Sequence, residues 1–260
     1  ERLTPGVVGV PNGVRRRTSS LRREEVAMLA GVGATWYTWL GQGRDVHPSN
    51  DVLSAIADAL RLAPAERRLL FALHNRPQAL DRSVSTEHIG DPLRRMLDSL
   101  TEQPAYIRGS RWDILAWNRA ADAVYGPYER LQGDHRNGLY MLFADPEHRR
   151  LISDWHTVAR ISLAMFRGDY AQHVGDPGFE RLVTKLTRIS PEFAEWWPLR
   201  DVAFPSTGPK HINHPVAGAM HFEYSSFGID DHPGMKLIAF TPLDKDSTLE
   251  KLRGLLRPIL

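Results

Sequence analysis

The sequence contains no cysteine among its 260 residues. Disulfide bonds, thiol catalysis and cysteine-containing metal sites are therefore excluded. No stretch approaches the ~20 apolar residues that a membrane-spanning helix needs. We therefore expect a cytoplasmic protein without a membrane partner. The length suits one large or two ordinary domains, and a hydrophobic content of 42% is ample for a core.

The sequence also lacks the usual signatures of catalysis. It has no Gly-x-Ser-x-Gly element. Gly31-Val-Gly33 and Gly41-Gln-Gly43 lack a preceding strand and a third glycine, so neither reads as a nucleotide-binding loop. His211 and His214 would point to opposite faces of a strand, which disfavours a metal site. We expect no catalytic residues, no metal and no cofactor, and we predict that the protein is not an enzyme.

The segment from Arg22 to Arg44 has the spacing of a helix-turn-helix. Val26 and Leu29 fall on one face of a first helix, and Gly31 can end that helix with a positive φ. Tyr37 and Leu40 then seat a second helix on the first. In this motif the second helix enters the DNA major groove. An ordinary helical hairpin is the alternative.

The helices that follow complete a small all-α domain. The pattern predicts one helix from Asn50 to Leu60, capped by Ser49 or Asn50, and another from Pro64 to His74 with Leu69, Leu70 and Leu73 inward. Residues 1–75 carry ten arginines and seven acidic residues, a net charge of +3, whereas the rest carries −1. This asymmetry suits contact with DNA phosphates.

We predict that this domain binds a double-stranded DNA operator as a homodimer, because one small helix-turn-helix reads few bases. Arginines would contact phosphates, and residues of the second helix would reach base edges or the backbone. The run of arginines could instead be a solvated arm. The predicted DNA-binding residues are Arg15, Arg16, Arg17, Arg22, Arg23, Ala34, Thr35, Thr38, Trp39, Gln42 and Arg44.

The weak periodicity of residues 76–90 predicts a linker, and residues 91–260 are predicted to form a second domain. Its expected helices span 91–101, 119–125, 146–166, 179–189, 191–197 and 248–256. Its expected strands span 105–108, 112–117, 210–213, 219–227 and 235–242. Asn118 can cap the helix that follows the second strand. The fold class is therefore α+β: an all-α domain, then an antiparallel sheet with several helices.

Several segments carry a resemblance to a known family. LRREEVAMLAGVGATWYTWLGQGRDV and VLSAIADALRLAPAERRLLFAL resemble bacterial XRE-type helix-turn-helix regulators of the MmyB-like group. RWDILAWNRAA, LFADPEHRRLISDW, SPEFAEWW and NHPVAG resemble that group's PAS-like ligand-binding domain, in the same order. Gly41 stands where the group usually has Glu. The resemblance also implies that a first helix of the family precedes this sequence.

The resemblance implies a one-component transcription regulator whose PAS-like domain binds an apolar, fatty-acid-like small molecule. The alternative is a PAS-like domain that serves only in dimerisation or protein interaction. Alternation would put Leu115 and Trp117 on one face of their strand, opposite Ile114 and Ala116. Large side chains could line a slot, or they could simply form the core. The predicted ligand-binding residues are Leu115, Trp117, Phe143, Met165, Phe166, Phe222, Tyr224, Ile238 and Phe240.

Overall fold

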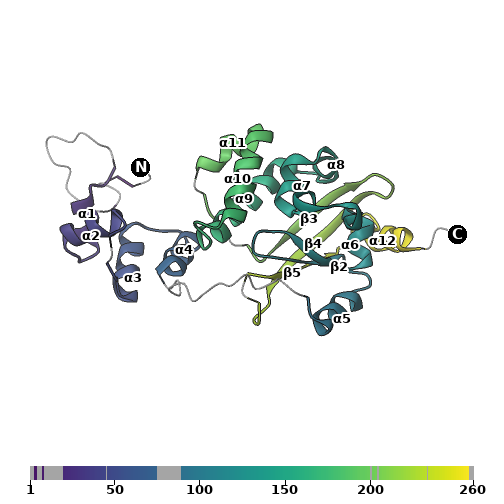
Figure 1. Cartoon of the computed structure of the whole chain (residues 1–260), viewed down its shortest axis with the longest axis horizontal. Helices are drawn as coiled ribbons and strands as arrows, with labels where there is room; N and C mark the ends of the chain where they lie inside the picture. Colours follow the sequence, from purple (N-terminus) through teal and green to yellow (C-terminus); the bar gives the residue numbers. More distant parts are fainter. Residues whose placement is uncertain are drawn as a thin grey trace. The chain divides into compact units, whose positions relative to one another are not determined.

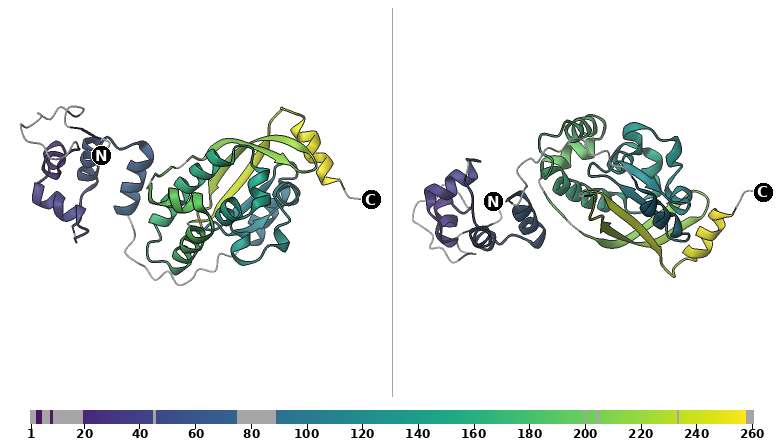
Figure 2. Two further views of the ribbon diagram at one scale, coloured as in Figure 1. Left: turned by 90° about the horizontal axis from the view of Figure 1, so that it is seen from above. Right: turned by 60° about the horizontal axis from the view of Figure 1, so that its bottom comes forward.

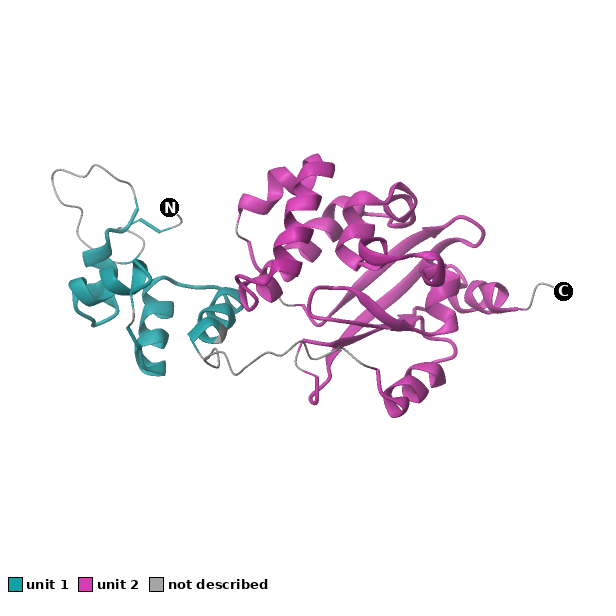
Figure 3. Cartoon of the chain, in the orientation of Figure 1, with its two compact units in different colours: residues 1–78 teal, residues 79–260 magenta. Residues whose placement is uncertain are grey.

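The computed structural model describes residues 3–4, 8, 20–44, 46–74, 89–199, 201–203, 205–232 and 234–257. The chain divides into two compact units, residues 1–78 and 79–260 (Figure 3). Most of the segment expected to be a linker lies outside the described residues. The α+β class predicted from the sequence is confirmed, because helices of the first unit precede a sheet with helices in the second.

The described part of the first unit consists mainly of four helices (Figure 1). Ser49 caps the third of them by accepting a hydrogen bond from the Val52 amide, and a proline opens the fourth as predicted. Their bounds are α1 Arg23–Leu29, α2 Ala34–Gly41, α3 Asn50–Ala59 and α4 Pro64–His74.

The turn between α1 and α2 has the predicted glycine geometry. Gly31 adopts φ +65°, which an L side chain rarely tolerates. The Val32 amide donates to the Ala27 carbonyl at 2.9 Å and closes the turn. The prediction for Leu29 was wrong, because it is 37% exposed while Val26 and Ala27 are buried. The buried stripe of α1 therefore runs through Val26 and Ala27, on a face adjacent to Leu29.

The inward placement predicted for Leu73, on α4, was also wrong. This residue is 43% exposed. Leu69 and Leu70 on the same helix are half-buried. The contacts of α4 in the unit are mainly with α3, and one partner helix covers only one side of a helix.

The second unit is built on an antiparallel five-stranded sheet in the order β2-β1-β5-β4-β3. The edge strands are therefore β2 and β3, and the first two strands pair before the chain leaves the sheet. Figure 2 shows the helices between β2 and β3 gathered against one face of the sheet. The strands span β1 Ala105–Arg108, β2 Ile114–Trp117, β3 Thr207–His214, β4 Gly218–Gly228 and β5 Lys236–Pro242.

The helices of this unit are mostly short and individually capped. Side-chain oxygens of Asn118, Asn137, Asp145, Asp176 and Ser190 accept hydrogen bonds from first-turn amides of the helices that they begin. The α-helices are α5 Asp91–Ser99, α6 Arg119–Tyr125, α7 Gly138–Ala144, α8 Pro146–Leu151, α9 Trp155–Ala171, α10 Pro177–Ile189, α11 Pro191–Trp196 and α12 Thr248–Leu256, and the 3-10 turns are η2 Tyr128–Arg130, η3 Gly133–Arg136 and η4 Trp197–Leu199.

The single helix predicted over residues 146–166 is in fact two helices, α8 and α9. Ile152 leaves helical geometry to form a β-bridge with Ile212 of β3. The Asp154 carboxylate then accepts from the Thr157 amide and starts α9. A contact with a strand distant in sequence thus breaks a continuous helical pattern, and this break brings α8 beside the edge of the sheet.

A β-bulge in β2 overturns the predicted alternation of side chains. Trp117 pairs with Tyr106 and Ala116 with Ile107, but Ile114 pairs with Arg108, so Leu115 has no partner. A bulge of this kind adds one residue and bends the strand. Ile114 and Trp117 consequently belong to one hydrophobic cluster, and Leu115 and Ala116 to another.

The two clusters lie on opposite faces of the sheet. The larger joins β4 and β5 to α6 through α11, and the smaller joins β1 and β2 to α5. Asn118 links these layers. Its side-chain oxygen accepts from the amides of Ala105 and Ala121, and its amide nitrogen donates to the carbonyls of Leu100 and Gln103. One side chain thus fixes α5, β1 and α6 together.

We predict that Asn118→Ala lowers the free energy of unfolding by roughly 2–4 kcal/mol, because a helix cap is lost and buried polar groups lose their partners. Asn118→Asp keeps the acceptor and should cost less. Urea denaturation followed by tryptophan fluorescence measures the change, with the exposed Asn213→Ala as control. A loss under about 0.5 kcal/mol for Asn118→Ala would contradict the structural role.

Candidate functional site

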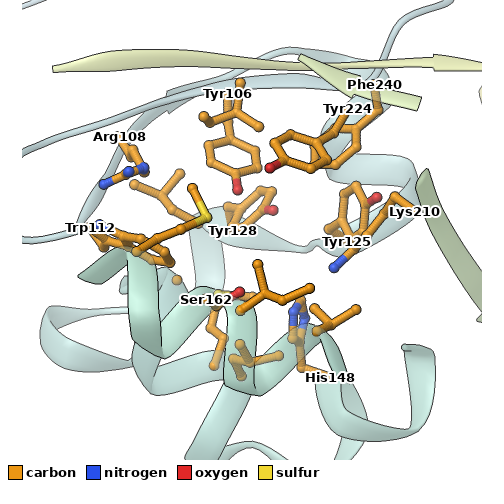
Figure 4. Close-up of a pocket in the computed structure, with 18 of the residues that line it drawn as sticks. Tyr106, Arg108, Trp112, Tyr125, Tyr128, His148, Ser162, Lys210, Tyr224 and Phe240 are labelled. Carbon is orange, nitrogen blue, oxygen red and sulfur yellow. The ribbon is translucent and has the colours of Figure 1, made fainter. Parts of the chain in front are cut away.

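A cavity of about 160 Å³ lies between the sheet and the helices of the second unit. Strands β1, β3, β4 and β5 contribute one wall, and α6 through α9 contribute much of the rest (Figure 4). Most of its lining is aromatic or aliphatic. The polar or aromatic lining residues are Tyr106, Arg108, Trp112, Tyr125, Tyr128, His148, Ser162, Lys210, Tyr224 and Phe240.

At one side of the cavity Arg108 is held by a carboxylate outside the lining. Its side chain is only 5% exposed, and Nη2 donates to Asp169 Oδ2 at 3.2 Å. The guanidinium stacks over the Trp112 ring, 4.1 Å from its centroid. Burial lowers the pKa of Arg108, and the neighbouring Asp169 opposes that shift. Arg108 Nη1 is buried and has no hydrogen-bond partner in the part of the chain that the structure describes.

The Asp169 carboxylate accepts hydrogen bonds from two further side chains. The Trp112 indole nitrogen donates to its Oδ2 at 2.8 Å, and Lys236 Nζ donates to its Oδ1 at 3.4 Å. Trp112 itself sits in the hairpin turn with φ +74°, a conformation that is strained for a large side chain. The strand predicted from residue 112 therefore begins only at Ile114. The conformation of this turn directs the Trp112 indole into the cavity.

At the other side of the cavity Lys210 has no counter-ion among the described residues. Figure 4 shows its ammonium pointing inward on the same side as Tyr125 and His148. Burial lowers the pKa of Lys210 to about 8. Burial, reinforced by Lys210, lowers the pKa of His148 to about 4, so this imidazole is neutral at pH 7. Among the described residues no hydrogen bond or ion pair satisfies the Lys210 ammonium.

The tyrosine hydroxyls of the cavity stay protonated over the working range of pH. Burial raises the pKa of Tyr106 and Tyr224 and raises that of Tyr125 and Tyr128 well above 10. The Tyr224 hydroxyl donates to the Pro205 carbonyl at 3.2 Å, whereas the buried Tyr125 hydroxyl has no hydrogen-bond partner among the residues described. The cavity thus offers an apolar space with a few polar atoms that lack partners.

In the first unit, α2 presents an exposed face. Ala34, Thr35 and Gln42 are exposed, and Trp39 is 41% exposed with the Arg44 guanidinium 5.8 Å from its ring centroid. The Thr38 hydroxyl donates to the Ala34 carbonyl at 2.8 Å, which leaves its methyl group for outside contacts. Tyr37 and Trp36 are half-buried. An exposed helix face of this kind can enter a DNA groove.

Comparison with known families decides what these two units are. Residues 14–70 match a helix-turn-helix domain, and residues 89–255 match the ligand binding domain of MmyB-like transcription regulators. The second match covers well over half of the chain. The chain belongs to the MmyB-like transcription regulators. No curated protein sequence matches it. The resemblance stated from the sequence is confirmed, and the protein is a DNA-binding transcription regulator.

The structure places the predicted ligand-binding residues of this MmyB-like regulator in three groups. Met165, Tyr224, Ile238 and Phe240 line the cavity. Leu115 lies in the cluster on the opposite face of the sheet, because of the bulge. The remaining residues pack in the larger core cluster without lining the cavity: Trp117, Phe143, Phe166 and Phe222.

Sequence reasoning missed the charged residues of the cavity. The signal that could have found Lys210 is strand alternation, because it shares a face of β3 with the buried Ile212. Tyr106 and Arg108 likewise share the cavity face of β1. Of the predicted DNA-binding residues, Arg22 and Arg23 are exposed at the start of α1. Arg15, Arg16 and Arg17 lie outside the described residues, and their role remains a prediction.

The regulator shows no sign of a metal site in the described part of the chain. His211 and His214 point to opposite faces of β3, as predicted: His211 contacts His221, whereas His214 contacts the Ala123 carbonyl. No helix among the described residues is both long and apolar enough to cross a membrane.

We predict that Lys210→Met raises the free energy of unfolding at pH 7 by roughly 1–2 kcal/mol, because the lowered pKa of the half-buried Lys210 means that its charged form disfavours the folded state. The folded pKa of about 8 lies below the unfolded value. The penalty is therefore full below pH 8 and disappears as the pH rises towards ~10.4. Urea denaturation at several pH values measures it.

The exposed lysine Lys245 offers a matched control. Lys245→Met should leave stability almost unchanged at every pH. Equal stability of wild type and Lys210→Met at pH 7 would contradict the assignment of a half-buried cation whose charged form is disfavoured.

Proposed function

We propose that this regulator binds an apolar, fatty-acid-like small molecule in a PAS-like domain. Binding of this ligand would change the affinity of the protein for its DNA operator, which α2 contacts. The observation that carries the proposal is the cavity of about 160 Å³ between the sheet and α6–α9. An engineered apolar cavity of ~150 Å³ holds a small organic molecule, and ligand sites are mostly apolar with a few placed polar groups. Both descriptions suit this cavity.

The proposed DNA contacts come from the exposed residues of α2 and the segment after it. Thr35, Trp39 and Gln42 face outward, and Arg44 can reach a phosphate beside them. The protein would bind as a homodimer, so that two copies of α2 occupy two half-sites about one helical turn apart, roughly 10 base pairs. The arginine run that includes Arg22 and Arg23 would add phosphate contacts that do not depend on sequence.

The coupling has a bounded size. A ligand shifts an equilibrium only by the difference between its affinities for two states, typically about 1–3 kcal/mol. Operator affinity should therefore change by roughly 5- to 150-fold on saturation. If instead the second unit serves only in dimerisation, adding the ligand would leave operator affinity unchanged.

We predict that Ser162→Phe abolishes the ligand response and spares operator binding by the ligand-free protein. Ser162 is on α9 and its hydroxyl points into the cavity (Figure 4), so a phenyl ring there would fill the space. The measurement is operator affinity with and without saturating octanoate, on a DNA site selected from random sequences. Thr157→Phe, at an exposed position of the same helix, is the control.

Overpacking can cost ~1–3 kcal/mol of stability, so the fold of Ser162→Phe must be checked by circular dichroism. A folded Ser162→Phe protein that responds to octanoate like wild type would show that the cavity is not the sensing site. An absent response in wild type as well would favour the dimerisation role.

We predict that Thr35→Ala and Thr38→Ala weaken binding to the selected operator more than binding to random DNA, because threonine can contact base edges or a thymine methyl. Fluorescence anisotropy on both DNAs measures the ratio. Thr187→Ala is a control, since its hydroxyl also donates to its own helix, but in the second unit. Equal losses on both DNAs, or a footprint over a single half-site, would overturn the proposed reading of a two-fold operator.

A further inference from the structure

The side chains that line the cavity differ strongly in their exposure to solvent. Tyr128, Met141 and Leu142, which come from η2 and α7, are buried. Ile161 of α9 also lines the cavity, yet it is 43% exposed. Pro209 of β3 is a second lining residue that is exposed. Since a residue that faces both the cavity and the solvent lies where the two meet, the mouth of the cavity lies between α9 and β3.

Backbone contacts hold α9 and the edge strand β3 together at two points. Just before α9, Ile152 forms a β-bridge with Ile212 of β3. Further along the helix, the Ala164 carbonyl accepts at 3.2 Å from the amide of Ala203, in the segment that leads into β3. Between these points, no hydrogen bond or ion pair among the described residues links α9 to β3. Pro209 has no amide hydrogen, so this position of the strand has none to donate.

Other borders of the cavity are closed by hydrogen bonds. The amide of Gly138, at the start of α7, donates to the Trp112 carbonyl at 2.9 Å and joins α7 to the β1–β2 hairpin. The Asp169 carboxylate accepts from Arg108 and so joins α9 to β1. An opening at either border would require a polar interaction to be broken. Between their two points of attachment, α9 and β3 can be parted by moving side chains alone.

A second hollow, between the end of α6 and α8, touches the cavity on another side. The two share three lining residues, Tyr125, Met141 and His148. Tyr125 and Met141 are buried, and the centroids of the Tyr125 and His148 rings are 6.3 Å apart. These side chains form a wall between the hollow and the cavity. The hollow is therefore the less favourable entrance, because packed side chains would have to separate to open it.

We propose that the ligand enters and leaves the cavity between α9 and β3, and that the side chain of Ile161 is the gate of this route. This inference rests on the function proposed above, because it assumes that the cavity holds a ligand. Ser162, the residue after Ile161, points into the cavity (Figure 4), so the gate stands directly beside the ligand space. An exposed side chain changes rotamer within nanoseconds, so Ile161 can leave the mouth without a rearrangement of the fold.

A gate of this kind controls rates rather than affinity. A group that blocks the mouth raises the barrier for entry and for exit by the same amount, because both pass through the same point. The association and dissociation rates then fall by the same factor, and the dissociation constant does not change. A residue that only contacts the bound ligand behaves differently, since its loss changes mainly the dissociation rate. Kinetics can therefore separate the two roles of Ile161.

The test attaches a removable plug at the mouth of the cavity in the full chain. The sequence has no cysteine, so Ile161→Cys introduces the only thiol. A glucose-bearing methanethiosulfonate attaches to that thiol as a disulfide, and dithiothreitol removes it. NMR exchange measurements with isotope-labelled octanoate give both rates and the dissociation constant. The plug should slow association and dissociation by roughly tenfold or more each, change the dissociation constant by less than about threefold, and lose its effect on reduction.

Three further variants carry the same plug at other positions. Pro209→Cys places it on the opposite side of the mouth and should give the same result as Ile161→Cys. Thr157→Cys places it at an exposed position of α9 outside the cavity lining, where the rates should not change. Arg150→Cys places it at an exposed position of the second hollow. Circular dichroism before and after modification checks that each protein stays folded.

The possible failures are distinguishable. Unchanged rates in the plugged Ile161→Cys and Pro209→Cys proteins, or slowing by the plug at Arg150→Cys instead, would overturn the route between α9 and β3 and leave the ligand cavity intact. A weaker affinity at an unchanged association rate would make Ile161 a ligand contact and not a gate. Failure of wild type to bind octanoate would overturn the proposed function together with this inference.

Discussion

The buried amide of Asn118 is the interaction on which the second unit depends, because it satisfies polar groups of three elements that belong to different layers. It ends β2, starts α6 and holds the chain after α5. Fixing the start of α6 in this way also fixes its end, where Tyr125 lines the cavity. The position of a cavity hydroxyl therefore follows from hydrogen bonds made one helix length away, in the dry interior between the layers.

The cavity combines features that a stable core would avoid. Within the described part of the chain, it holds a half-buried lysine without an ion-pair partner, a buried tyrosine hydroxyl without a hydrogen-bond partner and an arginine with one unpartnered nitrogen, in a mainly apolar lining. Each of these groups costs free energy in the empty protein. Departures from good packing are expected where a protein binds something. The packing of the surrounding aromatic cluster and the ion pair of Asp169 with Arg108 offset the cost of these polar groups.

Local signals in the sequence predicted those elements whose ends are set by local chemistry. The observed bounds of α4, α6 and α12 agree with the prediction, because prolines, caps and turn residues mark them. The break at Ile152 could not be predicted, since it depends on a bridge to β3. Strand alternation puts Lys210 on the face of the buried Ile212, but the helices that cover this face and form the cavity pack through contacts distant in sequence, which the local pattern does not contain.

The bulge at Leu115 makes the second strand sensitive to the number of its residues. Without the extra residue, strict pairing would carry on from Arg108 with Ile114, and the residues between there and Asn118 would exchange faces. Trp117 would leave the aromatic cluster for the side of α5, and Asn118 could no longer cap α6 in its present position. Relatives that share this architecture should therefore vary the side chains of this hairpin freely and its length hardly at all.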